Sequence, residues 1–150
     1  MEAIIRKSVK LQNMSDSKEF DWSNEKIMIA DDDIYSCLLL KNVLSKTGAK
    51  IIHAKNGKEA LEILKTDRTF SIVILDIIMP YLSGLEIVRR CKTLLPDTIF
   101  IAFTADVIRY NQVRCQEEGF NLCISKPVLP VKFLNIMQEA LALRGQLLEE

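Results

Sequence analysis

The sequence predicts an α/β protein built as a single (βα)5 domain around a doubly wound parallel sheet. From Lys26 onward, short β-branched runs alternate with segments of helical period, and this alternation is typical of βα units. The chain has 150 residues, of which 49% are hydrophobic. This length and composition suit one globular domain and leave no room for a second full domain.

Five apolar runs are expected to form the strands. They span residues 26–30, 50–54, 71–75, 98–103 and 121–125. The first, third and fourth runs are continuously apolar over four or more residues, as strands are when helices cover both faces of their sheet.

Two helix starts carry a capping signal. Asn56 and Ser83 each stand three residues before a glutamate, Glu59 and Glu86 respectively. In this spacing the first side chain and the glutamate can satisfy each other's free backbone amides. We therefore expect helices to open at both places.

Helix ends and the last helix are marked by glycine and proline. Gly48 and Gly119 stand where helices are expected to end, because a residue without Cβ adopts the left-handed conformation at no steric cost. Pro130 is well placed near the start of a last helix with one apolar face, and Gly145 is expected to close it. The sequence thus predicts a folded domain over residues 26–145 and a tail over 146–150.

Residues 1–25 differ from the rest of the chain. They are largely polar, mix charges of both signs and show no sustained period, which favours a flexible N-terminal extension outside the core.

Charge and hydropathy exclude several partners. The chain carries 20 Lys and Arg against 20 Asp and Glu, so it lacks the basic surplus that direct nucleic-acid binding needs. No apolar run is long enough for membrane insertion and no signal peptide is present, so we expect a cytoplasmic protein. The scattered cysteines Cys37, Cys91, Cys115 and Cys123 are expected to be reduced and buried.

Polar residues follow four of the five predicted strands. Asp31, Asp32 and Asp33 follow the first, Asp76 the third, Thr104 the fourth and Lys126 the fifth. Taken singly, each is as well explained by a helix cap or a solvated charge. Together they bring carboxylates, a hydroxyl and an ammonium to the ligand-binding edge of an open α/β sheet. Such carboxylates repel one another unless a cation is bound, and oxygen ligands favour Mg²⁺ over zinc.

The segments IMIADDD, ILDIIMPYLSG, IAFTAD and ISKP occur in this order. In order and spacing they resemble the signature stretches of response-regulator receiver domains of two-component signalling, over about residues 26–144. The resemblance implies a flavodoxin-like sheet of strand order 2-1-3-4-5. It also implies a phosphoacceptor that takes a phosphoryl group from a histidine kinase or phosphotransfer protein. Such a domain has Mg²⁺-dependent self-phosphorylation and autodephosphorylation and is not otherwise an enzyme.

Site roles follow from the same resemblance. Asp76 is implied as the phosphoacceptor, and Asp31 and Asp32 as an acidic pair in which Asp32 is the more direct Mg²⁺ ligand. Asp76 itself and the backbone carbonyl of Ile78 complete the implied metal ligands. A carboxylate suits this role because it is already ionised at neutral pH and needs only alignment and charge neutralisation.

The remaining roles concern charge and signalling. Lys126 is implied to pair with the phosphoryl oxygens, Thr104 to hydrogen-bond them, and Pro127 to follow a cis peptide bond. Asp33 is expected outside the site, as a helix N-cap. The signal is expected to leave through the face formed by the fourth helix, fifth strand and fifth helix, with Phe103 or Tyr110 as packing reporters.

Three positions depart from the usual family pattern. Cys123 stands three residues before the lysine, where receivers commonly place an aromatic ring that turns inward with the threonine. Ile78 and Asp106, each two residues after a site residue, are expected to affect the lifetime of the phosphoryl group.

Two other functions remain open at this stage. Asp31 and Asp33 have the spacing of the paired aspartates of haloacid-dehalogenase-like phosphatases, but the residues that follow do not fit and no cap domain is expected. A receiver-like docking module that is never phosphorylated is the second alternative. The segments around 21–26 and 125–127 resemble receivers fused to hybrid histidine kinases, and the sequence does not distinguish such a fragment from a free-standing regulator.

Overall fold

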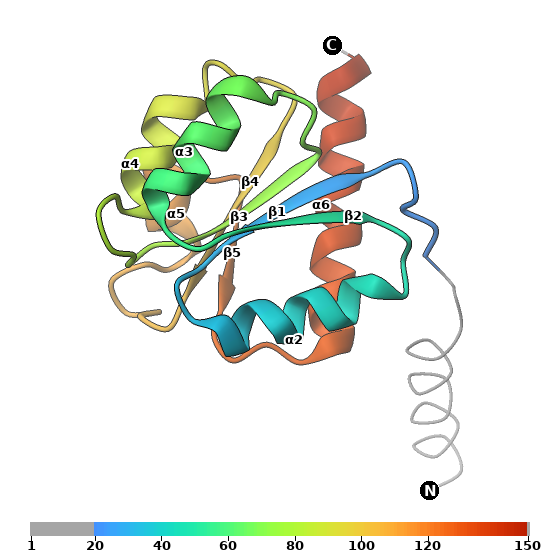
Figure 1. Ribbon diagram of the computed structural model, residues 1–150, viewed down its shortest axis with the longest axis horizontal. Helices are drawn as coiled ribbons and strands as arrows, with labels where there is room; N and C mark the ends of the chain where they lie inside the picture. The colour runs from blue at the N-terminus through green and yellow to red at the C-terminus, as the bar shows by residue number, and fades with distance from the viewer. Residues whose placement is uncertain (1–19, 150) are drawn as a thin grey trace, which may run out of the picture.

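The computed structural model describes residues 20–149, which form a parallel sheet with helices on both sides (Figure 1). The strands are β1 (Lys26–Ala30), β2 (Lys50–Ala54), β3 (Ile72–Asp76), β4 (Ile99–Thr104) and β5 (Leu122–Ser125). The helices are α2 (Ile34–Ser45), α3 (Gly57–Thr66), α4 (Gly84–Cys91), α5 (Gln112–Glu118) and α6 (Pro130–Glu149). The strand order is β2-β1-β3-β4-β5, with every pairing parallel. The (βα)5 fold and its flavodoxin-like order are confirmed.

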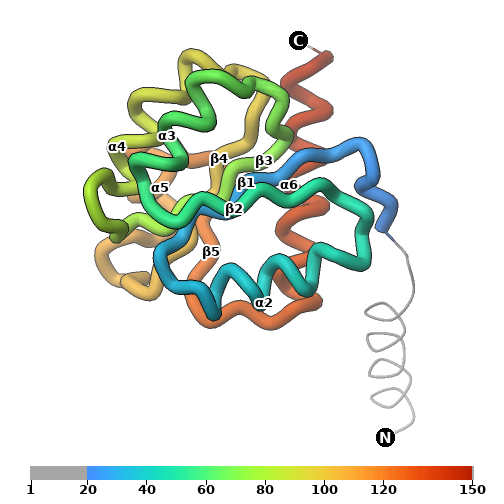
Figure 2. The backbone as a smooth tube through the Cα atoms, in the orientation of Figure 1, coloured from blue at the N-terminus to red at the C-terminus, as the bar shows by residue number. Residues whose placement is uncertain are grey.

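The helices divide between the two faces of the sheet. α2 and α6 contact each other on one face, and α3, α4 and α5 lie side by side on the other (Figures 1 and 2). The inner strands β1, β3 and β4 are almost wholly buried, whereas the edge strands β2 and β5 are partly exposed. The continuously apolar runs are therefore the strands in the middle of the sheet.

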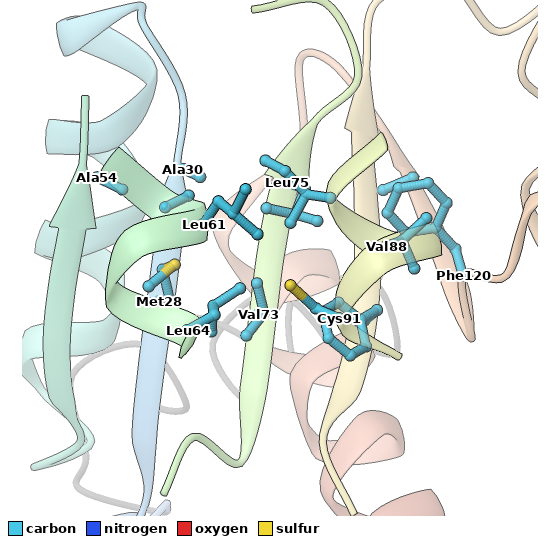
Figure 3. Close-up of a cluster of buried hydrophobic side chains, with 14 of the residues drawn as sticks. Met28, Ala30, Ala54, Leu61, Leu64, Val73, Leu75, Val88, Cys91 and Phe120 are labelled. Carbon is cyan, nitrogen blue, oxygen red and sulfur yellow. The ribbon is translucent and has the colours of Figure 1, made fainter. Parts of the chain in front are cut away.

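Each face of the sheet has its own apolar cluster. On one face, Met28 and Val73 of the sheet pack with Leu64 of α3 and Cys91 of α4 (Figure 3). Ile27 points to the opposite face and packs in the cluster under α2 and α6, because neighbouring strand residues face opposite sides. The sheet is thus fixed from both sides, and its strand ends are held in place for the site.

The predicted helix caps form as expected. The side chain of Asn56 accepts from the backbone N–H of Glu59 at 2.9 Å, and that of Ser83 from Glu86 at 3.2 Å. Gly119 ends α5 in the left-handed region, with φ of 114°, which a residue without Cβ adopts freely.

Strands β3 and β4 each begin and end one residue later than predicted. They begin at Ile72 and Ile99 rather than at Ser71 and Thr98. The hydroxyl of Thr98 donates to the backbone carbonyl of Phe70 at 2.8 Å, and that of Ser71 donates to Glu25. Through these hydrogen bonds, both polar side chains connect segments that directly precede strands of the sheet.

The expected end of the last helix at Gly145 is wrong. α6 continues through this residue to Glu149. A glycine inside a helix costs about 1 kcal/mol, and contacts on either side of it offset this cost. Leu143 and Leu147 pack against the core, and the Arg144 guanidinium donates to the carbonyl of Asp97 at 3.0 Å. No helix within residues 20–149 is both long and apolar enough to cross a membrane.

The predicted extension over residues 1–25 is too long at its C-terminal end. Residues 1–19 lie outside the described part of the chain, but Trp22 is only 7% exposed and packs with the α2 and α6 side of the core. Its backbone N–H donates to the carbonyl of Thr47 at 2.7 Å, and its ring lies 4.9 Å from that of Phe20. Polar residues separate Trp22 from the first apolar run, so the apolar pattern of the sequence does not predict that Trp22 belongs to the core.

Candidate functional site

The polar residues predicted at the strand ends meet at the carboxyl edge of the sheet. Asp31 follows β1, Asp76 ends β3, Thr104 ends β4 and Lys126 follows β5. Carboxylate oxygens of Asp31, Asp32 and Asp76 lie within 4.8 Å of one another. The parallel sheet brings these residues together because all its strands end at this edge.

Lys126 is shared between two of the carboxylates. Its ammonium lies 2.8 Å from Asp31 and 3.3 Å from Asp76, and 4.8 Å from the centre of the Phe103 ring. Burial alone would lower the pKa of Lys126, but the hydrogen bonds and charges of Asp31 and Asp76 outweigh it and raise the pKa. The lysine is therefore a fixed positive charge beside Asp76.

Two hydrogen bonds hold the carboxylate of Asp76 in place. One carboxylate oxygen accepts from Lys126 and the other from the backbone N–H of Ile78 at 3.2 Å. Burial, followed by the negative charge of Asp31, raises the pKa of this carboxyl to about 6, although Lys126 opposes the rise. Asp76 is consequently ionised at neutral pH, but less readily than a carboxylate in water.

Asp31 lies behind Asp76, with no exposed surface. Its carboxylate accepts from Lys126 and from the backbone N–H of Asp33 at 2.9 Å. Its backbone carbonyl lies 3.5 Å from the Cys37 thiol and 3.2 Å from the His53 ring, and these two side chains are 2.9 Å apart. Neither Cys37 nor His53 stands at a predicted strand end, so the sequence carried no signal that they lie beside the site.

Thr104 lies on the opposite side of Asp76 from Asp31. Its side chain is 2% exposed, and its hydroxyl oxygen accepts from the backbone N–H of Asp106 at 3.0 Å. Thr104, Asp106 and Ala105 line an open depression together with Asp76 and Lys126. Ile78 also borders it, with its side chain 65% exposed. The depression gives a reagent direct access to the Asp76 carboxylate.

Asp33 lies outside the acidic cluster. It is the N-cap of α2, and its carboxylate accepts from the backbone N–H of Tyr35 at 3.0 Å and from the Ser36 hydroxyl at 3.1 Å. The Asp33 carboxylate is therefore engaged at the start of α2 and is not one of the three carboxylates of the cluster, an arrangement that gives the phosphatase alternative no support. The peptide bond between Lys126 and Pro127 is cis, as expected.

A close backbone approach fixes the end of β3. A Cβ atom on Gly84 would lie 2.4 Å from the carbonyl oxygen of Asp76, and the Gly84 N–H donates to Ile77 at 3.0 Å. Glycine is thus required where α4 begins, because it lets the helix lie directly against the end of β3. The Ser83 cap motif predicted the helix start but carried no signal of this contact.

The donor set fits a hard divalent cation. Three carboxylates are gathered around one ammonium, so the cluster keeps excess negative charge when all three are ionised. All the side-chain donors in it are oxygen atoms, which suits Mg²⁺ and leaves room for water ligands.

Comparison of the chain with models of known protein families identifies its family. Residues 27–138 match the family model described as the response regulator receiver domain. The chain belongs to this family. The match runs from β1 into the first half of α6 and includes the carboxyl edge of the sheet, where the acidic cluster lies.

Relatives of this receiver domain include large kinases. It is 33% identical over 123 residues to Histidine protein kinase 1 of Candida albicans, and 29% identical over 120 residues to the sensor histidine kinase RcsC of Salmonella typhimurium. These matches cover 75% and 80% of the chain, but it spans only 5% and 12% of the two kinases. A 14.6 kDa protein of Leptolyngbya boryana is 30% identical, with 75% of the receiver chain and 87% of that protein covered.

Solved structures agree with the fold. A response regulator receiver domain protein from Clostridium thermocellum superposes with a TM-score of 0.73 at 26% identity, covering 82% of this chain and 98% of that one. The receiver domain of the sensor histidine kinase PA1611 from Pseudomonas aeruginosa gives 0.71 at 19% identity, with 79% and 98% covered. That protein is described with a magnesium ion coordinated in its active site cleft.

Proposed function

We propose that this receiver accepts a phosphoryl group on Asp76 from a phosphohistidine of a histidine kinase or a histidine phosphotransfer protein. The observation that carries the proposal is the position of Asp76, whose carboxylate lies at an open depression beside the ammonium of Lys126. An accessible carboxylate next to a fixed positive charge is suited to attack on phosphorus.

The chain's own residues account for the transfer step. An oxygen of Asp76 attacks the phosphorus, the bond from phosphorus to the donor imidazole breaks, and the imidazole leaves. Lys126 faces the incoming phosphoryl oxygens and offsets their charge. Asp31 keeps the ammonium in place through its 2.8 Å contact, so it acts as a positioning residue for Lys126.

Mg²⁺ is the proposed cofactor. Asp32, Asp76 and the carbonyl of Ile78 would hold it, with Asp31 close behind, and the oxygen-only cluster supports this set. When bound, the ion supplies charge neutralisation for the phosphoryl oxygens and for the acidic cluster. The magnesium described in the PA1611 receiver is consistent with this assignment.

We propose that Thr104 starts the switch. Its hydroxyl oxygen accepts from the N–H of Asp106, and its O–H would donate to an aspartyl phosphate, which adds close to two negative charges. Such a change would move the loop after β4 and reach the face formed by α5, β5 and α6. Hydrogen exchange with and without a beryllofluoride phosphoryl analogue tests this, and unchanged exchange over residues 104–130 would refute it.

An apolar surface beside the site supports a protein as phosphodonor. Ile34, Tyr35, Leu38 and Leu39 are exposed on the first two turns of α2, directly after the acidic cluster. Exposed apolar groups in one place mark protein contacts. We propose that the phosphohistidine-bearing partner docks on this surface, which brings its imidazole over Asp76. We propose that the transfer takes place in the cytoplasm, where histidine kinases obtain ATP.

We also propose the receiver as a unit that begins near Phe20 rather than at residue 26. The packing of Trp22 supports this boundary.

The proposed role of the domain is acceptance and release of a phosphoryl group, not turnover of a separate substrate.

Intact mass after incubation with acetyl phosphate and Mg²⁺ tests the proposal. One added phosphoryl group is expected in the native chain and none in Asp76→Asn. Asp33→Asn is the matched control, because asparagine also caps helices well, and it should be phosphorylated normally. A native chain that gains no mass would favour the docking module, and undiminished labelling of Asp76→Asn would exclude Asp76 as the acceptor.

A further inference from the structure

Two thiols converge on one backbone carbonyl at the side of the domain. The Sγ atom of Cys123, in β5, lies 3.5 Å from the carbonyl oxygen of Tyr110, and that of Cys115, in α5, lies 3.7 Å from the same oxygen. Both sulfur atoms thus approach one oxygen atom, which brings the two thiols close to each other. Cys115 and Cys123 are therefore neighbours although α5 and β5 are separate elements.

The two sulfur atoms differ in access. Cys115 is fully buried, whereas Cys123 is half-buried on the edge strand and borders a surface pocket between α5 and α6. A reagent in solution can reach Cys123 first, and Cys115 is then the thiol next to it. This is the arrangement of an exposed cysteine with a resolving partner.

We propose that Cys115 and Cys123 are a modification site, at which a small-molecule disulfide oxidises the two thiols to an intramolecular disulfide. The Cys123 thiolate attacks one sulfur of the reagent, forms a mixed disulfide and releases one thiolate. The Cys115 thiolate then attacks the Cys123 sulfur and releases the second. The protein loses two electrons and two protons, and the reagent is reduced to two thiols.

The environment of the thiols sets the rate of this reaction. Burial raises the pKa of Cys123, although the nearby Cys115 thiol opposes the rise, and burial together with the nearby Cys123 thiol raises the pKa of Cys115 to about 12. Because the thiolate is the reacting form, oxidation should be slow at neutral pH. It should accelerate about tenfold per pH unit while both thiols remain mostly protonated.

The disulfide would act on the loop that follows β4. Tyr110 also donates its N–H to the carbonyl of Asp106 at 2.9 Å, and the N–H of Asp106 donates to the Thr104 hydroxyl at 3.0 Å. Oxidation removes both S–H groups from the Tyr110 carbonyl and so loosens one end of this chain of hydrogen bonds. An effect on phosphorylation would rest on the function proposed above, but the change in the loop can be measured without it.

The other cysteines provide matched controls. Cys91 is buried in the core between the sheet and α4 (Figure 3), and Cys37 is buried in the cluster on the opposite face. Neither shares a hydrogen-bond acceptor with a second thiol in the contacts described for it. Both should stay reduced under conditions that join Cys115 to Cys123.

Peptide mapping tests the site. The full chain is incubated with oxidised glutathione between pH 7 and 9, alkylated under denaturing conditions and digested without reductant. A peptide cross-linked between Cys115 and Cys123, reversed by dithiothreitol, is expected, and it should persist in Cys91→Ala. Cys123→Ser, at a half-exposed position that tolerates change, should remove it. Glutathione retained on Cys123 without a cross-link, or alkylation of all four thiols, would overturn the proposal.

Hydrogen exchange tests the effect on the loop. The oxidised chain is expected to exchange faster than the reduced chain over residues 104–112, whether or not Asp76 can be phosphorylated. The Asp76→Asn chain should show the same difference, which separates this test from the proposed function. Changes confined to residues 115–123 would overturn the coupling to the loop.

Discussion

Lys126 and Asp31 are 95 positions apart in the sequence, yet the ammonium of one donates to the carboxylate of the other at 2.8 Å. Asp31 has no exposed surface, so Lys126 is the cation that compensates a fully buried charge. The same ammonium reaches Asp76 at 3.3 Å. The pair therefore links the stability of the domain to the charge beside Asp76, and its effects on stability and on phosphorylation can be tested separately.

Replacing Lys126 by methionine should destabilise the domain, because it leaves the buried Asp31 carboxylate without its cationic partner. Breaking a buried ion pair from one side costs about 3–5 kcal/mol, and urea unfolding measures it. The double variant Lys126→Met with Asp31→Asn should recover most of the loss. The exposed Lys58→Met is the control and should change little. A double variant no more stable than Lys126→Met would show that Asp31 is not the cause.

Asp76→Asn should stabilise the metal-free protein at pH 7.5. The pKa of Asp76 is raised to about 6, so the folded state resists ionisation of this group. The penalty is absent below about pH 4, the pKa of an aspartate in the unfolded chain, and is fully present above pH 6. A gain of about 1–3 kcal/mol is expected at pH 7.5, and little at pH 4. Thermal melts at both pH values measure it, and a gain independent of pH would contradict the cause.

Asp32→Asn should weaken Mg²⁺ binding by tenfold or more, which corresponds to about 1.4 kcal/mol. Asp32 belongs to the acidic cluster, and its exposed side chain leaves it free to meet a hydrated ion. Calorimetric titration with MgCl₂ measures the affinity. Asp33→Asn, one residue along and outside the cluster, should bind as the native protein does. Equal affinities for both variants would contradict the proposed ligand set.

Leu38→Glu should slow phosphotransfer from a phosphorylated histidine phosphotransfer protein while leaving labelling by acetyl phosphate unchanged. Leu38 is 55% exposed in the apolar surface of α2, so a charge there would hinder docking but not chemistry. Val113→Glu, on the similarly exposed α5 position, is the control. Equal slowing by both variants would argue against α2 as the docking surface.

Two glycine substitutions should have opposite effects. Gly84→Ala is expected to destabilise the domain and to reduce phosphorylation, because the new Cβ would meet the Asp76 carbonyl. Gly145→Ala meets no atom within 4 Å and should stabilise α6 by about 0.5–1 kcal/mol. Melting temperatures and acetyl phosphate labelling compare the two. Destabilisation by Gly145→Ala would contradict the helical course of α6 through this position.

The sequence predicted what depends on local pattern. The strand runs, the caps at Asn56 and Ser83 and the position of Asp33 as an N-cap are all local features, and the structure has them. Convergence of the strand-end residues followed from the parallel sheet alone. The roles of the individual site residues stay predictions until phosphorylation and metal binding are measured.

What the sequence did not predict depends on contacts between distant segments. Trp22 is buried because α2 and α6 offer it an apolar surface, and Gly145 remains helical because its neighbours pack against the core. The approach of Gly84 to Asp76, and of Cys115 to Cys123, likewise results from how separate elements pack. No spacing along the chain carries such information.

Trp22 also determines which structural changes the tryptophan fluorescence of this protein can report. It is the single tryptophan of the chain and lies beyond the amino end of β1, whereas Asp76 lies at the carboxyl end of β3. Its fluorescence therefore follows the packing of the far end of the sheet and is insensitive to local quenching by a ligand at the acidic cluster. The fluorescence of Trp22 is therefore suited to the unfolding measurements above. Any change in it caused by phosphorylation would mean that a structural change extends along the full length of the sheet.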